Sequence, residues 1–340
     1  MTQAVTKTDR WTIRPEGSNW GDFGADDELG MMNTITDEMR LAAMREVKEG
    51  KAFALSLPLD YPGGEAEDAV RFGPKLFATK LGGTAVFNHN VSPVDVCCDD
   101  GVTMCLQYST QWDSFAHWGR MYDVDGSGVL KPTYYNGWRA GIDTLGSDQP
   151  GGPKCLKLGV EKMAMTGAQG RGVLVNLVEA FGRGRTLVTN EMLQNVMKAQ
   201  NVEVKKGDFL LLYTGYGDYL MQSNKSPDEE MMAHKVGSCL EGNDEPLLNW
   251  ISESGVVALV SDASAVEQFD TSFQVKSDRG LMPLHDHCLF RRGIHLGEMF
   301  YLTDLAEHLW KVKRSAHLFT GPALRLTGAA GSPATAVATV

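Results

Sequence analysis

The segment Leu106–Trp118 combines residue types that metal sites and acid–base catalysis use. Its amide, hydroxyl and carboxylate side chains recur at every second position, as Gln107, Ser109, Gln111 and Asp113. Side chains two residues apart lie on the same face of a β-strand. The spacing therefore predicts a row of polar groups along one face of one strand.

This polar row needs partners if the strand carries it into a buried cleft. The preceding run Val102–Leu106 is apolar and β-prone, which predicts that the strand enters from the core. Buried polar groups are costly when unpaired, and water, neighbouring strands or a metal ion could satisfy them. Asp113 adds an anionic oxygen, and His117 adds a group that titrates near neutral pH.

A second group of candidate ligands lies near the C-terminus, in the stretch Pro283–Glu298. It contains three histidines and two acidic residues: His285, Asp286, His287, His295 and Glu298. Metal sites draw their ligands from more than one element and favour imidazole and carboxylate donors. This stretch can therefore supply the ligands that a single strand around Asp113 lacks.

The first segment resembles the signature His-x-Gly-Thr-His-x-Asp-x-Pro-x-His of the cyclase, or kynurenine formamidase-like, family of metal-dependent hydrolases, which includes isatin hydrolase. Thr110, Asp113 and His117 match this signature, whereas Gln107 and Gln111 stand where the family has histidines. The resemblance runs from about residue 18 to the C-terminus. Over this length the chain is similar to the longer branch of the family. It is carried further by Trp20–Gly30 with Asn33, Tyr135–Gly137, Gly170–Leu174, Pro283–His285, Gly297–Glu298 and Gly331–Pro333.

The resemblance implies an α/β protein with the swivelling β/β/α, kynurenine formamidase-like fold and a divalent metal ion, Mn²⁺ or Zn²⁺. The ligands that it implies are Gln107, Gln111, Asp113, His285 and Glu298. His287 competes with His285 for its place, and His117 is the implied catalytic acid–base residue. Hydrogen bonds between strands, a turn-capping acid and a core histidine are the alternative roles for these side chains.

The expected reaction is hydrolysis of a C–N or C–O bond, in an amide, imide, N-formyl group or lactone, by metal-activated water. Aromatic side chains near the signature suit a flat, cyclic or aromatic substrate. We expect substrate contacts from Trp112, Phe115, Trp118 and Tyr135. The loop-rich stretch 119–155 is expected to help wall the pocket. The alternative is a catalytically inactive small-molecule binding protein of the same fold.

Composition narrows the class of partner. The 340 residues carry a net charge of −11, and 43% are apolar, as is ordinary for a globular enzyme. Without a Lys/Arg-rich run, neither nucleic acid nor an anionic membrane is expected as a partner. The N-terminus lacks the apolar segment of a signal peptide, so we expect a cytoplasmic protein. We expect it to form a homodimer or homotetramer.

Hydrophobic patterning predicts one α/β domain over residues 18–340, after a mobile N-terminal segment, 1–17. A capped helical pattern over 189–200 leads into an apolar strand at 209–215, and a helix at 246–252 leads into a strand at 256–260. Helix followed by buried strand, twice, predicts helices flanking a sheet. Further strands are expected at 52–60 and 173–177.

Overall fold

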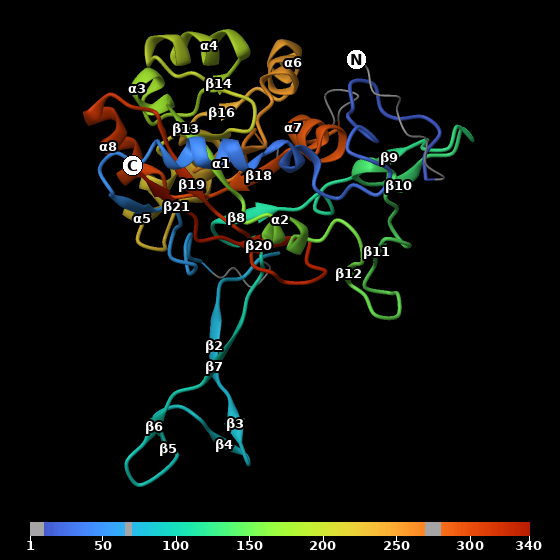
Figure 1. Cartoon of the computed structure of the whole chain (residues 1–340). Coiled ribbons are helices and arrows are strands. Elements are labelled where there is room, and N and C mark those ends of the chain that lie inside the picture. Colours follow the sequence, from blue (N-terminus) through green and yellow to red (C-terminus); the bar gives the residue numbers. More distant parts are fainter. Residues whose placement is uncertain (1–9, 65–69, 269–279) are drawn as a thin grey trace.

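A nine-stranded mixed sheet forms the centre of the molecule in the computed structural model, which describes residues 10–64, 70–268 and 280–340 (Figure 1). Across the sheet the strands follow the order β1 (Ala52–Ala54), β21 (Val337–Thr339), β19 (Ala316–Thr320), β13 (Gln169–Asn176), β15 (Phe209–Tyr213), β17 (Ala258–Ser261), β18 (His295–Glu298), β8 (Gln111–Asp113) and β20 (Gly331–Pro333). This confirms the predicted α/β class, and the predicted strands at 52–60, 173–177, 209–215 and 256–260 all contribute to this sheet.

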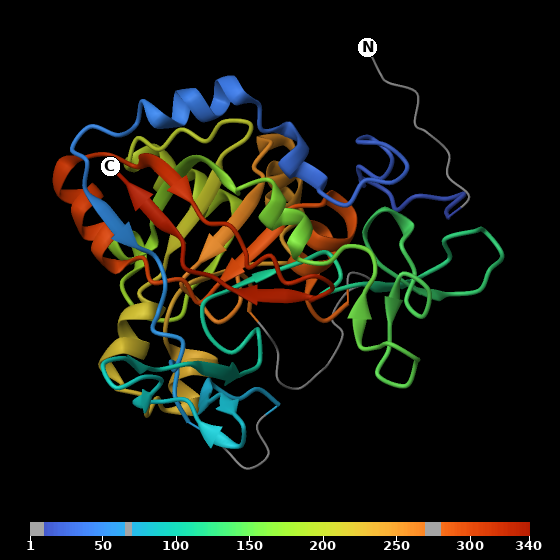
Figure 2. The ribbon, with the colours of Figure 1, turned by 60° about the horizontal axis from the view of Figure 1, so that its bottom comes forward.

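The middle of the sheet is parallel and its two sides are antiparallel. Strands β13, β15, β17 and β18 run parallel, while β8 pairs antiparallel with both β18 and β20. Every residue of β15 is buried, as expected for a parallel strand covered on both faces. The sheet curls, and helices lie on its outside (Figure 2). The antiparallel pairing of β8 with β18 brings together two segments that are far apart in the sequence.

The two predicted helix–strand units are confirmed. Helix α4 (Asn190–Ala199) begins after Thr189, whose side chain accepts a hydrogen bond from the Met192 amide, and α6 (Glu245–Ser254) ends at Gly255 in the left-handed conformation. They precede β15 and β17 respectively. The other α-helices are α1 (Asp37–Met44), α2 (Glu161–Met165), α3 (Leu177–Phe181), α5 (Tyr216–Gln222), α7 (Pro283–His285) and α8 (Thr303–Val312). No helix among the described residues is long and apolar enough to cross a membrane.

Residues 75–103 form a long projection, which we call the arm (Figure 1). Its stem is the antiparallel pair β2 (Lys75–Ala78) and β7 (Asp100–Thr103). Two short hairpins form its end: β3 (Lys80–Leu81) with β4 (Thr84–Ala85), and β5 (His89–Asn90) with β6 (Val96–Cys97). The prediction that Val102 begins a strand leaving the core is therefore wrong. Val102 lies in the arm and is 51% exposed.

Short elements complete the fold. The stretch 119–155 contains the hairpin β9 (Arg120–Tyr122) with β10 (Lys131–Thr133), a 3-10 turn at Tyr135–Gly137, and the pair β11 (Thr144–Leu145) with β12 (Lys154–Cys155). Strands β14 (Leu187–Val188) and β16 (Cys239–Leu240) pair beside the main sheet, 3-10 turn η1 spans Gly30–Thr34, and π-helical turns η3 and η4 span Met231–Lys235 and Asp286–Arg292.

Part of the predicted N-terminal segment belongs to the folded body. Residues 1–9 lie outside the described residues, but Trp11 is 3% exposed and its ring lies 6.2 Å from that of Trp20. The Thr12 amide donates a hydrogen bond to the Val124 carbonyl. Residues 10–17 are therefore packed against the rest of the chain.

Candidate metal centre

Three buried side chains from two strands and one helix converge in the curl of the sheet. Asp113 ends β8, Glu298 ends β18, and His285 ends α7, which continues into η4. One ligand atom from each of Asp113, His285 and Glu298 lies within 4.8 Å of the other two. The antiparallel register that pairs Gln111 with Glu298 places the two strand carboxylates beside each other.

The charge of this cluster favours a cation. Asp113 is fully buried and Glu298 is 4% exposed, so both carboxyl groups have lost most of their contact with water. Burial, and then the negative charge of Asp113, raise the pKa of Glu298 above its usual range, against the lowering effect of His285 and Arg71. Two neighbouring buried carboxylates are stable as anions only beside a compensating positive charge.

Gln111 connects the two carboxylates. Its Nε2 donates hydrogen bonds to Asp113 Oδ1 (3.3 Å) and Glu298 Oε2 (3.2 Å), while its Oε1 is buried without a hydrogen-bond partner among the described residues. Asp113 Oδ2 is likewise buried and unpartnered there. Turning the Gln111 amide by 180° exchanges its nitrogen and oxygen, which makes it an oxygen donor toward the same space. Amide and carboxylate oxygens with one imidazole form a donor set that suits a divalent ion.

Glu267, which the sequence patterns did not single out, fixes the orientation of His285. Its Oε1 accepts hydrogen bonds from the His285 amide (2.8 Å) and from His285 Nδ1 (2.9 Å), and its Oε2 accepts one from the Leu284 amide (2.9 Å). Because a carboxylate only accepts, the Nδ1 atom carries the proton, and Nε2 is directed toward Glu298 Oε1, 3.5 Å away. Carboxylate–histidine pairs of this kind orient metal-binding histidines.

The same contacts determine the charge of His285 when no cation is present. Burial by itself lowers the pKa of His285, but the hydrogen bond to Glu267 and the charges of Glu298 and Glu267 outweigh burial and raise it to about 9. The imidazole must give up its Nε2 proton before that nitrogen can bind a metal ion. A proton and a metal ion therefore compete for this position.

His117 lies at the edge of the cluster. Its Nε2 is 3.8 Å from Asp113 Oδ1, and its ring centroid is 6.5 Å from that of His285. Burial lowers the pKa of His117, Asp113 opposes this, and His285 and Arg71 add to the lowering. The side chain is one-fifth exposed, so it can reach a bound molecule. His117 therefore lies next to the three candidate ligands but outside their cluster.

The predicted continuous strand around Gln107 is wrong. Strand β8 contains only Gln111–Asp113, and residues 106–110 form a turn. Ser109 donates its hydroxyl to the Pro58 carbonyl, and the Gln107 amide lies against Gly331, whose backbone pairs with Asp113. Gln107 thus borders the centre, but Gln111, Asp113, His285 and Glu298 are the predicted ligands that the structure brings together.

Arg71 is a second residue near the centre that sequence patterns gave no reason to select. Its Nη1 donates a hydrogen bond to the Gln107 carbonyl (2.8 Å), and the side chain is exposed. Its charge acts on both Glu298 and His117, as their pKa values show. Arg71 and Gln107 lie just outside the two ends of the arm, so a positive charge is held at the rim of the centre.

The four aromatic residues expected to contact substrate lie in two different environments. Trp112 is fully buried and donates to the Gly321 carbonyl, and Phe115 stacks on His295 at 4.2 Å between ring centroids. Tyr135 is also fully buried and donates its hydroxyl to Asp27. These three side chains belong to the core. Trp118 is only partly buried, and its ring meets that of His285 edge-on at 5.5 Å.

The remaining candidates of the C-terminal stretch have other partners. Nε2 of His287 lies 2.9 Å from the Ser252 hydroxyl, and Asp286 forms ion pairs with Arg120 and Arg291. Nδ1 of His295 is 3.2 Å from the Asp113 carbonyl and so supports the backbone of β8. Of the two histidines proposed for one ligand position, His285 is therefore the one in the cluster.

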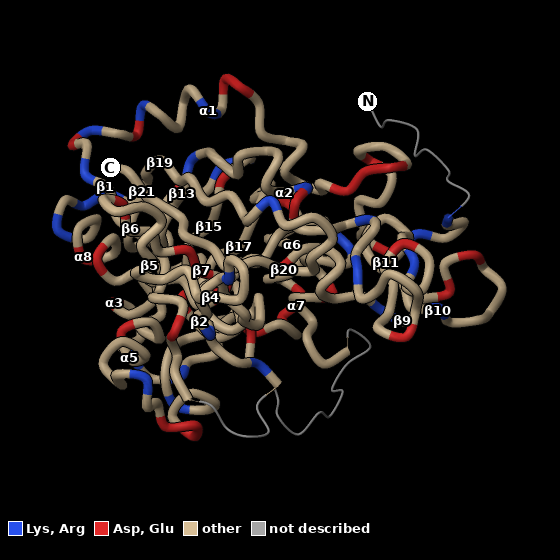
Figure 3. The backbone as a smooth tube through the Cα atoms, turned by 90° about the horizontal axis from the view of Figure 1, so that it is seen from below, with Lys and Arg blue, Asp and Glu red and all other residues tan. Residues whose placement is uncertain are grey.

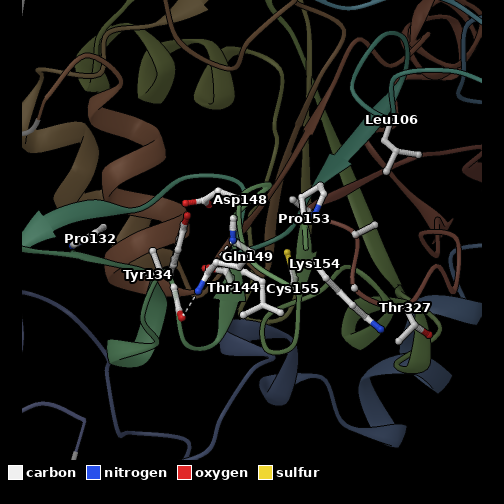
Figure 4. Close-up of a pocket in the computed structure, with 18 residues that line it drawn as sticks. Leu106, Pro132, Tyr134, Thr144, Asp148, Gln149, Pro153, Lys154, Cys155 and Thr327 are labelled. Atoms are coloured by element: carbon white, nitrogen blue, oxygen red, sulfur yellow. Dashed lines mark hydrogen bonds between the residues drawn. The ribbon is translucent and has the colours of Figure 1, made fainter. Parts of the chain in front are cut away.

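A cavity of about 930 Å³ is walled largely by the stretch 132–155, together with residues 327–330 (Figure 4). Tyr134 and Lys154 are among its lining residues. Its lining also includes Leu106, Ala116 and Ala330, the immediate chain neighbours of Gln107, His117 and Gly331. The loop-rich stretch that was predicted to form a pocket wall thus forms one, but Asp113, His285 and Glu298 are not among the residues that line this cavity.

Comparisons with known proteins agree with this architecture. The model of the cyclase family matches residues 45–268. A crystal structure described as a novel cyclase is 26% identical, with a TM-score of 0.74 over 99% of this chain and 100% of that chain. No curated protein matches.

Isatin hydrolases share the fold at lower identity. Isatin hydrolase A from Labrenzia aggregata, bound to benzyl benzoate, is 12% identical with a TM-score of 0.56, over 85% of this chain and 93% of that one. Isatin hydrolase A from Ralstonia solanacearum is 14% identical with a TM-score of 0.55, over 90% and 97%. The fold expected from the sequence motifs is thereby confirmed.

Proposed function

Because the chain belongs to the cyclase family, we propose that it is a metal-dependent hydrolase whose divalent ion is held by Asp113, His285 and Glu298. The observation that carries this proposal is the convergence of three buried ligand atoms within 4.8 Å. The buried, unpartnered oxygens of Asp113 and Gln111 support it, since both could turn toward a cation. Mn²⁺ and Zn²⁺ are the ions we propose.

His117 is proposed as the proton-transfer residue. A divalent ion in this centre, when bound, polarises a substrate carbonyl and lowers the pKa of water. His117 accepts the proton of the attacking water and returns it to the leaving nitrogen or oxygen. Burial lowers the pKa of its imidazole, which keeps it neutral and able to accept a proton near pH 7. Asp113, 3.8 Å away, stabilises the imidazolium that results.

The proposed substrate is a small, cyclic or aromatic molecule with a hydrolysable C–N or C–O bond. Trp118, whose ring meets that of His285 edge-on, supplies aromatic surface for a flat ring. Hydrolysis of an amide, imide or lactone leaves a carboxylate. Arg71 at the rim is suited to attract that group, because guanidinium binds carboxylates in a forked geometry.

A second candidate function is binding of a small molecule without catalysis. The observation that favours it is the Gln111 amide, which bridges Asp113 and Glu298 through its own N–H groups. In that arrangement a side chain, not a cation, holds the two carboxyl groups together. The two functions predict opposite metal contents.

Metal analysis combined with a substrate panel tests the proposal. The chain is purified without a histidine tag, and its manganese and zinc are measured alongside hydrolysis of a lactam, a cyclic imide, an aromatic N-formyl amine and a lactone. We expect a stoichiometric divalent ion and hydrolysis that a chelator removes and the ion restores. A chain that stays free of metal after incubation with either ion, yet binds members of the panel, would assign the binding function instead.

A further inference from the structure

A second cavity, of about 430 Å³, lies where the ends of α4 and α8 meet strand β13. Its volume is within the range of small-molecule sites, which is roughly 300–1,000 Å³. It shares no lining residue with the cavity beside the stretch 132–155, and none of the candidate metal ligands lines it. It is therefore a separate place at which a small molecule could bind.

The walls of this cavity are apolar and include one half-exposed tryptophan. Leu174, Ala306 and Leu309 line it and are almost completely buried, so they form a fixed apolar surface. Trp310, also in the lining, is 47% exposed. A tryptophan ring offers a large flat contact surface at a small cost in side-chain entropy. These residues suit a ligand with a flat apolar body.

The charged residues of the lining are both cations. They are Lys313 and Arg314, and no acidic side chain lines the cavity. With Lys311 they place three basic residues within four positions at the end of α8, among the lysines and arginines marked in Figure 3. The whole chain has a net charge of −11, so this local excess of positive charge runs against its composition.

Both cations keep donors available for a ligand. Lys313 is exposed and forms no ion pair with another described residue. Arg314 donates from Nη2 to the carbonyls of Glu46 and Ala316, whereas its Nη1 has no hydrogen-bond partner among the described residues. Ammonium and guanidinium groups form their strongest hydrogen bonds with anionic oxygens. The cavity therefore favours an anionic group on the ligand and disfavours a cationic one.

The remaining polar side chain that we can place makes the cavity rigid. Gln200 accepts a hydrogen bond from the Asn176 amide at Oε1 (2.9 Å) and donates one to the Asn176 carbonyl from Nε2 (2.7 Å). Both residues belong to the lining. Because this amide ties the end of α4 to the end of β13, the cavity does not depend on a bound molecule for its shape.

We propose that this cavity is a second ligand site, which binds a small carboxylate with a flat apolar body. The apolar body packs on Trp310 and Leu309, and the carboxylate pairs with Lys313 and Arg314. The site involves none of the residues of the metal centre, so it holds whether or not that centre hydrolyses a substrate.

Fluorine resonance of labelled tryptophan tests the proposal at the cavity itself. The full chain, with its seven tryptophans replaced by 5-fluorotryptophan, is titrated with each of three probes. Phenylacetate has ring and charge, phenylacetamide has the same shape without the charge, and acetate has the charge without the ring. The variant Trp310→Phe identifies the signal of Trp310 by its loss, and Trp118→Phe identifies that of Trp118.

We expect phenylacetate to shift the Trp310 signal in a saturable way. Its dissociation constant should be at least about tenfold lower than that of either other probe, because each lacks one of the two contacts. Equal affinities for phenylacetate and phenylacetamide would overturn the proposal, as would a Trp310 signal that phenylacetate leaves unchanged. A saturable shift of Trp118 alone would place the binding at the metal centre and overturn it as well.

A matched pair of charge reversals sharpens the test. Lys313→Glu should raise the dissociation constant of phenylacetate at least about tenfold, because it places a negative charge beside the carboxylate. Lys311→Glu makes the same change on an exposed residue that does not line the cavity. It should change the constant by less than about twofold, because salt screens exposed charges at a distance. Equal effects of the two variants would show that only the overall charge matters, against the proposed site.

A third variant fills the cavity. Ala199 is exposed at the end of α4 and lines the cavity, so Ala199→Phe should occupy its space without disturbing the core. Circular dichroism verifies the fold. The folded variant should no longer show the saturable shift of Trp310, and a shift of unchanged size and affinity would contradict binding in this cavity.

Discussion

The candidate metal centre and the arm place their side chains in opposite environments. Around β8 and β18, carboxylates and an imidazole are buried in a body whose strands are apolar on both faces, so charge is concentrated where water is excluded. In the arm, apolar side chains project into solvent from a ribbon with no core beneath it. Groups placed against their solvation preference in a folded chain are held there for a ligand or a partner. The centre thus calls for a cation, whereas the arm leaves its apolar side chains exposed to solvent.

The largest effect is expected from Asp113→Ala. Removing a fully buried anion from the cluster removes much of the charge that offsets a divalent ion, so metal and activity should be lost together, with turnover reduced by roughly a thousandfold or more. Metal content and initial rates measure this. Ser109→Ala is the control and should keep both, because Ser109 is four residues from Asp113 and donates its hydroxyl to the Pro58 carbonyl. Full metal occupancy and turnover in Asp113→Ala would contradict the proposed metal centre.

His117→Ala should lower turnover by about a hundredfold to ten-thousandfold and leave the metal bound, because we assign His117 to proton transfer. Burial and the neighbouring His285 and Arg71 lower its pKa, and a bound cation would lower it further. The ascending limb of activity against pH should therefore lie below pH 6.5 in the wild type and flatten in the variant. His308→Ala, at a histidine paired with Glu49 outside the centre, serves as the control. Metal loss in His117→Ala would instead make His117 a ligand.

A matched pair of leucines compares the two regions directly. Leu211 in β15 is fully buried, and Leu76 in the arm is 74% exposed. Leu211→Ala should lower the free energy of unfolding by about 2–5 kcal/mol, because it leaves a cavity. Leu76→Ala should stay within about 0.5 kcal/mol of the wild type, because the side chain packs on little of its own chain. Equal losses in chemical denaturation would show that the arm packs on its own chain.

Glu267→Gln tests the orientation of His285. The amide keeps the volume but weakens the acceptor for the Nδ1 proton, so metal affinity should fall by about tenfold to a hundredfold. Glu161→Gln is a matched control, because Glu161 is also buried and accepts a backbone hydrogen bond, from Gly328. Titration of the metal-free proteins with Mn²⁺ measures both. Equal affinities for Glu267→Gln and the wild type would leave Glu267 a purely structural residue.

The smallest effect concerns the choice of metal. An amide oxygen from Gln111 shifts the donor set toward oxygen, which suits Mn²⁺ better than an imidazole would, although Zn²⁺ generally binds more tightly at a given site. Gln111→His should therefore raise the affinity for Zn²⁺ relative to that for Mn²⁺. Reconstitution of the metal-free protein with each ion measures this ratio. If Zn²⁺ alone restores wild-type activity and Mn²⁺ never does, the argument from donor type is wrong.

The sequence by itself determined the elements whose signals are local. The cap at Thr189, the apolar run Phe209–Tyr213 and the glycine that ends α6 each fix a helix or strand through contacts within a few residues. The α/β class followed from these patterns, and the motif resemblance identified the family. Asp113, His285 and Glu298 could be named because residue types singled out their two segments and the family resemblance implied these positions as ligands.

Tertiary structure alone decided which of these side chains meet. Alternation suggested that Gln107 continues the strand of Gln111, but a turn separates them, because the chain leaves the body at Arg71 and returns at Gln107 after the arm. An apolar run such as the one at Val102 has the same sequence pattern in a core strand and in an exposed ribbon. The burial of Val102 could therefore not be inferred from the sequence. The role of Glu267 depends on bringing two segments together through the parallel pairing of β17 and β18. Such contacts depend on strand order, which hydrophobic periodicity does not encode.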